Sequence, residues 1–119
     1  MQHMIEYQWK IFWAGLDPVK DSEQSGIRPV IVISSEDINN SLSVVGVLPL
    51  TSMKEGRKIY PTEVFLPMDK TGLNKDSISM SHQIRVISKS RLIKKCGEIL
   101  TVEIKEEIKK SIKTFLDLD

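Results

Sequence analysis

The residue types best suited to chemistry stand together in one polar stretch, residues 21–29, which lies between two apolar runs. Within it Glu23 offers a carboxylate, Gln24 an amide and Arg28 a guanidinium, beside two serine hydroxyls. A long polar loop between neighbouring core strands is usually functional, because loops carry binding and catalytic groups on a rigid scaffold. Pro29 biases Arg28 toward an extended backbone, which would hold the guanidinium at a strand edge.

Several familiar kinds of reactive centre are missing from the sequence. It contains one cysteine, Cys96, and two histidines, His3 and His82, so it lacks a Cys/His cluster with zinc spacing. It has neither a glycine-rich phosphate loop nor a Gly-x-Ser-x-Gly nucleophile turn. The polar loops of a small β fold suit recognition of an extended polymer, or acid–base chemistry without a metal.

Size and charge narrow the class of protein. The chain has 119 residues, which predicts a single domain over residues 1–119, with residues 1–8 as a flexible N-terminal tail. A formal net charge of +1 argues against a DNA-coating protein but leaves room for a small basic groove. We expect no membrane span and no signal peptide, and the single cysteine suits a reducing cytoplasm.

The apolar patterning predicts several short strands and one helix. Strands are expected over residues 10–16, 29–34, 43–50, 62–66, 77–81 and 83–87, with a turn or edge strand over 91–97 and a short helical turn over 35–40. Pro49 is expected to lead the third strand out of the sheet. Thr101 is expected to cap a helix whose apolar residues run from Ile104 to Leu116. The predicted fold is mainly β, a small antiparallel sheet or open barrel that a C-terminal helix closes on one side.

Taken in order, the sequence blocks resemble the MazF/PemK toxins. The first blocks are Ile11-Phe12-Trp13, Leu16-Asp17-Pro18, Ser22-Glu23-Gln24, Gly26, Arg28-Pro29 and Val32-Ile33-Ser34. The later ones are Leu50-Thr51-Ser52, Tyr60-Pro61-Thr62-Glu63-Val64, Gly72-Leu73, Lys75-Asp76-Ser77, Gln83-Ile84-Arg85 and Lys89-Ser90-Arg91-Leu92. The resemblance covers nearly the whole chain from Lys10 onward, and the Ser-Glu-Gln-x-Gly-x-Arg-Pro element is specific in this context.

The resemblance implies the toxin of a type II toxin–antitoxin system, an endoribonuclease also called an mRNA interferase. The family fold is a small, strongly curved antiparallel β-barrel, SH3-like and similar to CcdB. The implied partners are single-stranded RNA along the face of a homodimer, and a cognate antitoxin whose disordered C-terminal segment covers the same groove. The toxin–antitoxin complex would bind DNA. Family cleavage takes place in the cytoplasm without metal or cofactor, and 2′-hydroxyl attack leaves a 2′,3′-cyclic phosphate and a 5′-hydroxyl.

Arg28 and Thr51 match the positions that the family uses for catalysis. The Arg28 guanidinium can grip two phosphate oxygens and stays charged, so we expect it to stabilise the crowded phosphate rather than act as a base. Thr51 is expected at a strand end, where its hydroxyl can reach a phosphate oxygen. Glu23 is either the proton acceptor or an ion-pair partner that orients Arg28, and both interpretations stay open.

Substrate-binding residues are expected on the same loop and on a second polar rim. They are Ser22, Gln24, Ser52, Gln83 and Arg85. A basic loop over residues 54–58 either adds a salt-dependent phosphate contact or is simply solvated. Trp13 is expected to pack, whereas Trp9 or Tyr60 is free to stack on a base.

Three features depart from the family pattern. Relatives usually carry glycine and an acidic residue where this chain has Trp9 and Lys10. This difference is expected to affect the entry into the first strand and the dimer edge. Asp21 replaces a glycine, and aspartate tolerates a left-handed backbone better than most residues. His82 replaces a residue that is commonly acidic, so it either assists catalysis as a base or forms hydrogen bonds at the rim.

Two further functions stay open at this point. The first is an RNA-binding module with weak or no cleavage, because Asp21 adds a negative charge near the phosphate site. The second is a CcdB-like toxin that poisons DNA gyrase. The pair of Arg28 and Thr51 favours RNA cleavage, so the leading prediction is a metal-independent, sequence-specific endoribonuclease.

Overall fold

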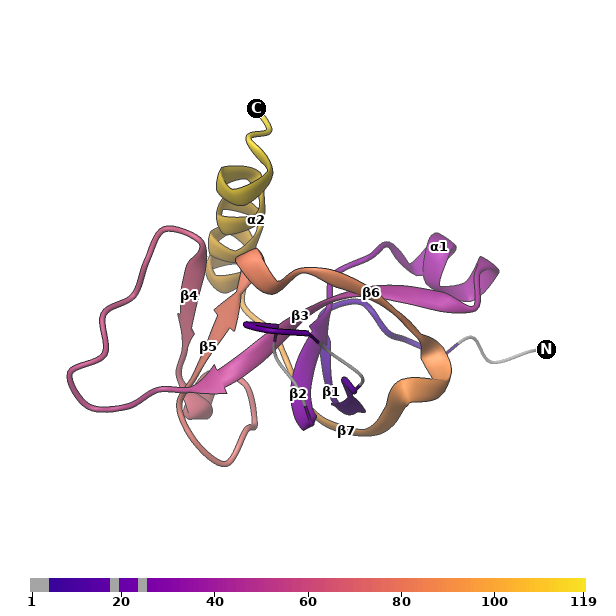
Figure 1. Ribbon diagram of the computed structural model, residues 1–119, viewed down its shortest axis with the longest axis horizontal. Coiled ribbons are helices and arrows are strands. Elements are labelled where there is room, and N and C mark those ends of the chain that lie inside the picture. Colours follow the sequence, from indigo (N-terminus) through magenta and orange to yellow (C-terminus); the bar gives the residue numbers. More distant parts are fainter. Residues whose placement is uncertain (1–4, 18–19, 24–25) are drawn as a thin grey trace.

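The computed structural model describes residues 5–17, 20–23 and 26–119, which form a curved sheet with a long helix beside it (Figure 1). The strands are β1 (Lys10–Gly15), β2 (Ile27–Val32), β3 (Val44–Ser52), β4 (Glu63–Leu66), β5 (Ser77–Met80), β6 (Arg85–Ser88) and β7 (Leu92–Glu98). The helices are α1 (Glu36–Ser41) and α2 (Val102–Leu116), and the short 3₁₀ turns are η1 (Met68–Lys70), η2 (Ser81–Gln83) and η3 (Lys89–Arg91). The predicted fold class, mainly β with a C-terminal helix, is confirmed. Within the described ranges, every helix is too short or too polar to cross a membrane.

The long strand β3 is the pivot of an antiparallel sheet. The strand order is β4-β5-β3-β2-β1-β7, and β6 pairs with the first half of β3. Among the described strands β4 and β7 are the two ends and do not pair with each other, so the sheet is open and the expected barrel does not close. It stays open because the β4–β5 hairpin packs with α2, away from β7 (Figure 1).

The prediction that Pro49 leads β3 out of the sheet is wrong. β3 continues to Ser52, with Pro49 opposite Val30 of β2 and the next residue, Leu50, opposite Ser79 of β5. Proline has no N–H to donate to a ladder. The missing donor therefore falls where β3 exchanges one partner strand for the other, and the strand extends through Thr51.

Two apolar clusters form the core. One packs residues of the sheet, such as Ile31 and Leu48, against Ile104 and Ile108 of α2. The other lies within the curve of the sheet and contains Ala14, Leu16, Val30, Val32, Val45, Val47 and Ile87. Full burial of one such side chain contributes about 1.5–3 kcal/mol. The stripe on α2 thus explains how the helix is held, although its last turn, with Phe115 at 42% exposure, extends past the sheet.

The N-terminal segment is held where a tail was expected over residues 1–8. The backbone N–H groups of Tyr7 and Gln8 donate to the Glu36 carboxylate at 2.9–3.1 Å, and the Gln8 side chain donates to the Ile33 carbonyl. Asn39, which is fully buried, donates to the same carboxylate at 3.1 Å. Tyr7 and Gln8, the last two residues of the expected tail, are therefore hydrogen-bonded to Glu36 of α1.

The entry into β1 shows how the two unusual residues are accommodated. Trp9 has φ of 67°, in the left-handed region that glycine adopts most easily. Its N–H donates to the Val32 carbonyl and its carbonyl accepts from Ile99, each at 2.8 Å. Lys10 forms an ion pair with Glu98 across β1 and β7 at 2.8 Å, and this hydrogen bond raises the pKa of Lys10.

Replacing Glu36 with glutamine is expected to lower the free energy of unfolding by about 1.5–3 kcal/mol at neutral pH, because charge-assisted hydrogen bonds are lost. Partial burial favours the protonated form, but hydrogen bonds from Asn39, Gln8 and Tyr7 outweigh it and lower the pKa of Glu36. The contribution is therefore complete above the unfolded-state pKa and is lost as the pH falls through the folded-state pKa.

Urea unfolding of wild type and Glu36→Gln at neutral and acidic pH measures this difference, which should shrink toward the acidic end. Asp37→Asn is the control, because Asp37 is an exposed acid in the same first turn of α1. Equal losses in the two variants would contradict the role of the Glu36 carboxylate.

Candidate active site

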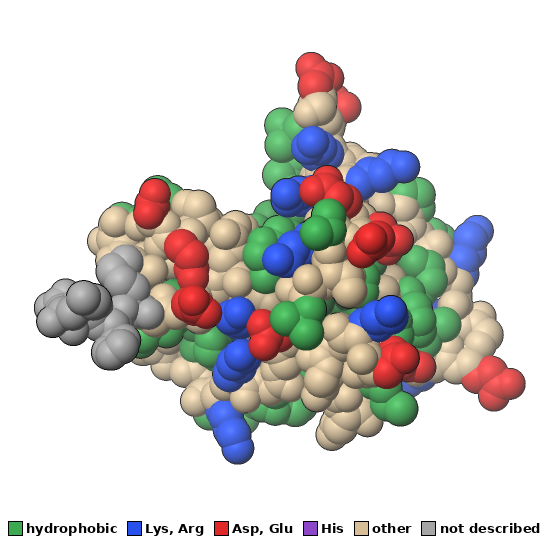
Figure 2. Space-filling model, turned by 180° about the vertical axis from the view of Figure 1, so that it is seen from behind, with side chains coloured by type: hydrophobic (Ala, Val, Ile, Leu, Met, Phe, Trp, Pro, Cys, Tyr) green, Lys and Arg blue, Asp and Glu red, His purple; other side chains and the backbone are tan. Residues whose placement is uncertain are grey.

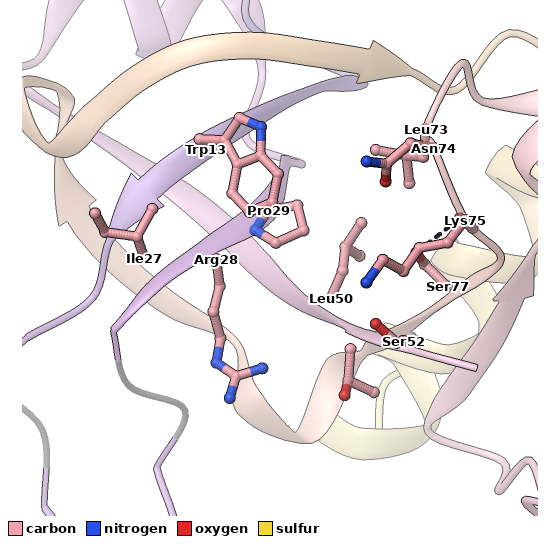
Figure 3. A pocket seen from close by; sticks show the side chains of 11 residues that line it. Trp13, Ile27, Arg28, Pro29, Leu50, Ser52, Leu73, Asn74, Lys75 and Ser77 are labelled. Carbon is pink, nitrogen blue, oxygen red and sulfur yellow. Dashed lines mark hydrogen bonds between the residues drawn. The ribbon is translucent and has the colours of Figure 1, made fainter. Parts of the chain in front are cut away.

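A pocket of about 340 Å³ opens beside the ends of β2 and β3. It is lined by Trp13 from β1, Ile27, Arg28 and Pro29 from β2, Leu50, Thr51 and Ser52 from β3, and Leu73, Asn74, Lys75 and Ser77 around the start of β5. Arg28 and Lys75 extend from opposite walls (Figure 3). The lining residues that the structure describes hold two cations and several hydroxyls but no carboxylate, which suits an anionic ligand.

Arg28 and Thr51 are brought together by the pairing of β2 with β3. The ladder ends with Val30 opposite Pro49, so Arg28 and Thr51 each lie two residues beyond its last pair. Both side chains are half-buried and line the pocket. The structure thus brings two predicted catalytic residues into one cavity, with Ser52 beside them.

Glu23 lies outside this pocket and is exposed. Its carboxylate accepts a hydrogen bond from the Lys20 N–H at 2.7 Å. Among the described residues no ion pair joins Glu23 to Arg28, so the interpretation of Glu23 as the ion-pair partner of Arg28 finds no support. Gln24 lies outside the described residues.

Within the described residues, a side-chain contact joins the second polar rim to the first loop. Gln83, at the end of η2, donates from its side chain to the Ser22 carbonyl at 3.3 Å. Arg85 at the start of β6 is half-buried, and its Nη1 is buried without a hydrogen-bond partner in the described part of the chain. His82 is exposed and its Nδ1 bonds the Thr62 hydroxyl at 3.0 Å. The rim therefore lies beside the loop, while the pocket itself is lined by other residues.

The basic loop is held by an internal ion pair. Arg57 binds the carboxylate of the buried Glu63 at 2.7 Å and donates to the Lys58 carbonyl at 2.8 Å. The hydrogen bond from Arg57 is the main reason why the pKa of Glu63 is lowered. Arg57 thus anchors the loop, and Lys54 and Lys58 remain as its exposed cations.

Positive backbone angles shape the loop between β1 and β2. Asp21 has φ of 54° and Gly26 has φ of 75°, so the expectation that Asp21 tolerates a left-handed backbone is confirmed. The base of the loop is closed by the Leu16 N–H on the Gly26 carbonyl at 2.9 Å, and by the Gly26 N–H on the Asp17 carboxylate at 3.1 Å. Arg91 of η3, which is not part of this loop, donates to the Gly15 carbonyl at 3.2 Å.

Three lining residues were missed as site residues in the sequence. Trp13 was expected to pack, but it is 37% exposed at the pocket, opposite Pro29 in the β1–β2 ladder. Lys75 stands only in one of the sequence blocks shared with the family, and no sequence pattern singles out Asn74. Trp9, in contrast, packs against the core, and Tyr60 is exposed beneath the Lys58 ammonium. Strand register and loop packing decide these placements, and neither is visible in local sequence patterns.

Charge elsewhere on the surface is mixed. On the face opposite the view of Figure 1, acidic and basic side chains are interspersed (Figure 2). Among the described residues no three of the His, Cys, Asp and Glu side chains gather closely enough to hold a metal ion. The pocket at Arg28 and Lys75 is therefore a local concentration of cations on a chain of net charge +1.

The chain is similar in sequence to a known family of proteins. Residues 7–116 match the family described as PemK-like, MazF-like toxin of type II toxin–antitoxin systems. The chain is 32% identical over 114 residues to endoribonuclease MazF9 of Mycobacterium tuberculosis, covering 92% of this chain and 94% of the relative. It is 38% identical over 96 residues to endoribonuclease MazF of Staphylococcus saprophyticus, covering 81% and 79%.

Solved structures agree with this match. The Mycobacterium tuberculosis toxin MazF-mt6 superposes with a TM-score of 0.74 at 26% identity, covering 92% of this chain and 98% of that one. An endoribonuclease from a mycobacterial species, solved in complex with its cognate antitoxin, has the same fold, with a TM-score of 0.77 at 20% identity and coverage of 97% and 98%.

Gly26→Ala is expected to destabilise the protein by about 1–2 kcal/mol, because a side chain strains the left-handed backbone at this position. Among the described residues, a Cβ at this position would meet no atom within 4 Å, so the loss is attributed to the backbone conformation. Gly15→Ala is the matched control at the other end of the same loop, with equally open space and no positive φ. Urea unfolding should place Gly15→Ala within about 0.5 kcal/mol of wild type. Similar losses in both variants would contradict the conformational argument.

Proposed function

The chain belongs to the PemK-like, MazF-like family of toxins of type II toxin–antitoxin systems, and we propose that it cleaves single-stranded RNA at the pocket of Arg28 and Thr51. It is an endoribonuclease, the activity for which its curated relatives are named. The observation that carries the proposed location is the pocket lining, which combines two cations with hydroxyls and lacks carboxylates. A polyanion finds charge complementarity there that the mixed surface of Figure 2 does not offer.

The proposed reaction uses the hydroxyl of the substrate itself as the nucleophile. The 2′-oxygen loses its proton, attacks the adjacent phosphorus and expels the 5′-oxygen, which takes up a proton. The products are a 2′,3′-cyclic phosphate and a 5′-hydroxyl. Arg28 binds the phosphate oxygens, where negative charge grows in the transition state, and Thr51 donates a hydrogen bond to one of them. No metal or cofactor takes part in this proposal.

Glu23 is the proposed proton acceptor. It stands in the loop that leads to Arg28, and its exposed carboxylate is held by the Lys20 N–H, so it stays available to a bound substrate. Ser22, Ser52, Gln83 and Arg85 are the proposed substrate contacts, together with Gln24. The alternative base is His82, whose ring is exposed beside the same rim.

The proposed assembly is a homodimer that acts in the cytoplasm and is inhibited by an antitoxin. A structural relative has been solved with its cognate antitoxin, which supports a partner of this kind. The antitoxin would lay a disordered C-terminal segment over the RNA groove, and the complex of the two proteins would bind DNA. The cationic pocket suits such a segment if it carries acidic side chains, because acidic residues would compete with phosphate for Arg28.

Cleavage of long RNA by the purified protein in the presence of EDTA tests the proposal. We expect new ends that carry a 2′,3′-cyclic phosphate and a 5′-hydroxyl. Cleavage that EDTA abolishes would contradict the metal-independent reaction, and RNA that is bound but uncut would leave only the binding-module alternative.

Arg28→Ala is expected to lower kcat by about 10²–10³-fold, because a preorganised charge at the phosphate is lost. Arg28→Lys should restore only part of the rate, since lysine keeps the charge without the fork. Single-turnover cleavage measures both variants, and Lys110→Ala, an exposed lysine of α2, controls for net charge. Wild-type rates in Arg28→Ala would overturn the assignment.

Glu23→Gln is expected to lower kcat/KM by about 10²–10⁴-fold, the usual contribution of a general base, with His82→Gln close to wild type. If kcat/KM falls in His82→Gln and not in Glu23→Gln, the base is His82.

A further inference from the structure

The wall of the pocket opposite Arg28 is formed by residues 73–75, and its backbone is fixed at both ends. At one end the Leu73 N–H donates to the Thr71 hydroxyl at 3.2 Å. At the other end the Ser77 hydroxyl donates to the Lys75 carbonyl at 3.2 Å. A short segment held in this way presents its side chains in a defined direction, as a substrate contact requires.

The two polar side chains of this wall face the cavity. Figure 3 shows the Asn74 amide and the Lys75 ammonium directed into the pocket from the same side. Within the described residues neither group has a hydrogen-bond or ion-pair partner, and both residues are exposed. Because the described part of the lining includes no aspartate or glutamate, no carboxylate there neutralises the Lys75 charge.

Part of the lining between this wall and Arg28 is apolar, beside the Thr51 and Ser52 hydroxyls. Leu73, Pro29 and the 37% exposed ring of Trp13 supply this apolar surface. The volume of about 340 Å³ lies within the range of small-ligand sites. A flat ring can lie on this surface while its polar edge faces an amide and its attached phosphate faces an ammonium.

We propose that Asn74 and Lys75 form a nucleotide subsite, in which Lys75 binds the phosphate next to the scissile one and Asn74 recognises the base on the apolar surface. Asparagine carries a donor and an acceptor side by side, which can pair with the edge of one base and leave another unsatisfied. Lysine adds a point charge without base preference. The subsite rests on the proposed function, since it divides the same pocket into a cleaving side and a selecting side.

The phosphate contact is tested by binding of a randomised 2′-O-methyl RNA pool, which keeps bases and phosphates but lacks the attacking hydroxyl. Lys75→Ala is expected to weaken binding and to make the slope of log affinity against log salt shallower by about 0.7, the value for one phosphate of a single strand. Lys75→Arg should restore the slope. Lys110→Ala removes an exposed lysine outside this pocket, and an equal change of slope in that variant would overturn the contact.

The base contact is tested by sequencing the ends cut from randomised RNA. Asn74→Ala is expected to reduce discrimination about tenfold at one position beside the cut, and to leave the other positions unchanged. Asn74→Asp keeps an acceptor but loses the N–H donors, so it should shift preference toward a base that donates at that edge. An unaltered base profile in both variants would overturn the subsite.

Failure of this subsite differs from failure of the proposed function. Wild type that cuts RNA while the Asn74 and Lys75 variants match it would overturn the subsite alone. Wild type that binds the 2′-O-methyl pool but cuts no RNA would overturn the proposed cleavage, and the base preference is then determined from the bound sequences. Circular dichroism confirms that each variant is folded.

Discussion

The register of β2 against β3 is the constraint on which the site depends. With Val30 opposite Pro49 as the last pair, Arg28 and Thr51 lie just beyond the ladder and line the same pocket. A slip of one residue would turn every side chain of one strand to the other face of the sheet. The register cannot slip, because Val30, Leu48 and Val47 are completely buried and hold the strands in place. Core packing in the middle of the sheet therefore determines the geometry at its edge.

The same strand also connects the two halves of the molecule. β3 pairs with β2 up to Pro49 and with β5 from Leu50, so its last residues face both the Arg28 loop and the segment before β5. The pocket forms in the opening that this exchange leaves, which explains why its walls come from four separate parts of the chain.

Sequence reasoning located most elements and the central residues, and it failed where distant segments decide the outcome. The apolar stripe of α2 and its Thr101 cap follow from local rules, and the Thr101 hydroxyl does accept from the Ile104 N–H. The open sheet, the straight passage of β3 through Pro49 and the anchoring of Tyr7 to Glu36 depend on partners far along the chain. The place of Trp13 and Lys75 in the pocket has the same origin, because its walls come from segments far apart in the chain.

Charge pairing explains how a chain of net charge +1 can still bind a polyanion. Arg57 is bound to Glu63, and Lys10 is bound to Glu98, so these cations are neutralised within the fold. Arg28 and Lys75 line a pocket whose described lining residues include no carboxylate. A phosphate there meets local positive charge in a partly enclosed space, where screening by water is weaker than on the open surface. The fold therefore concentrates its attraction for phosphate in this pocket. A protein with a generally basic surface would instead attract phosphate over much of that surface.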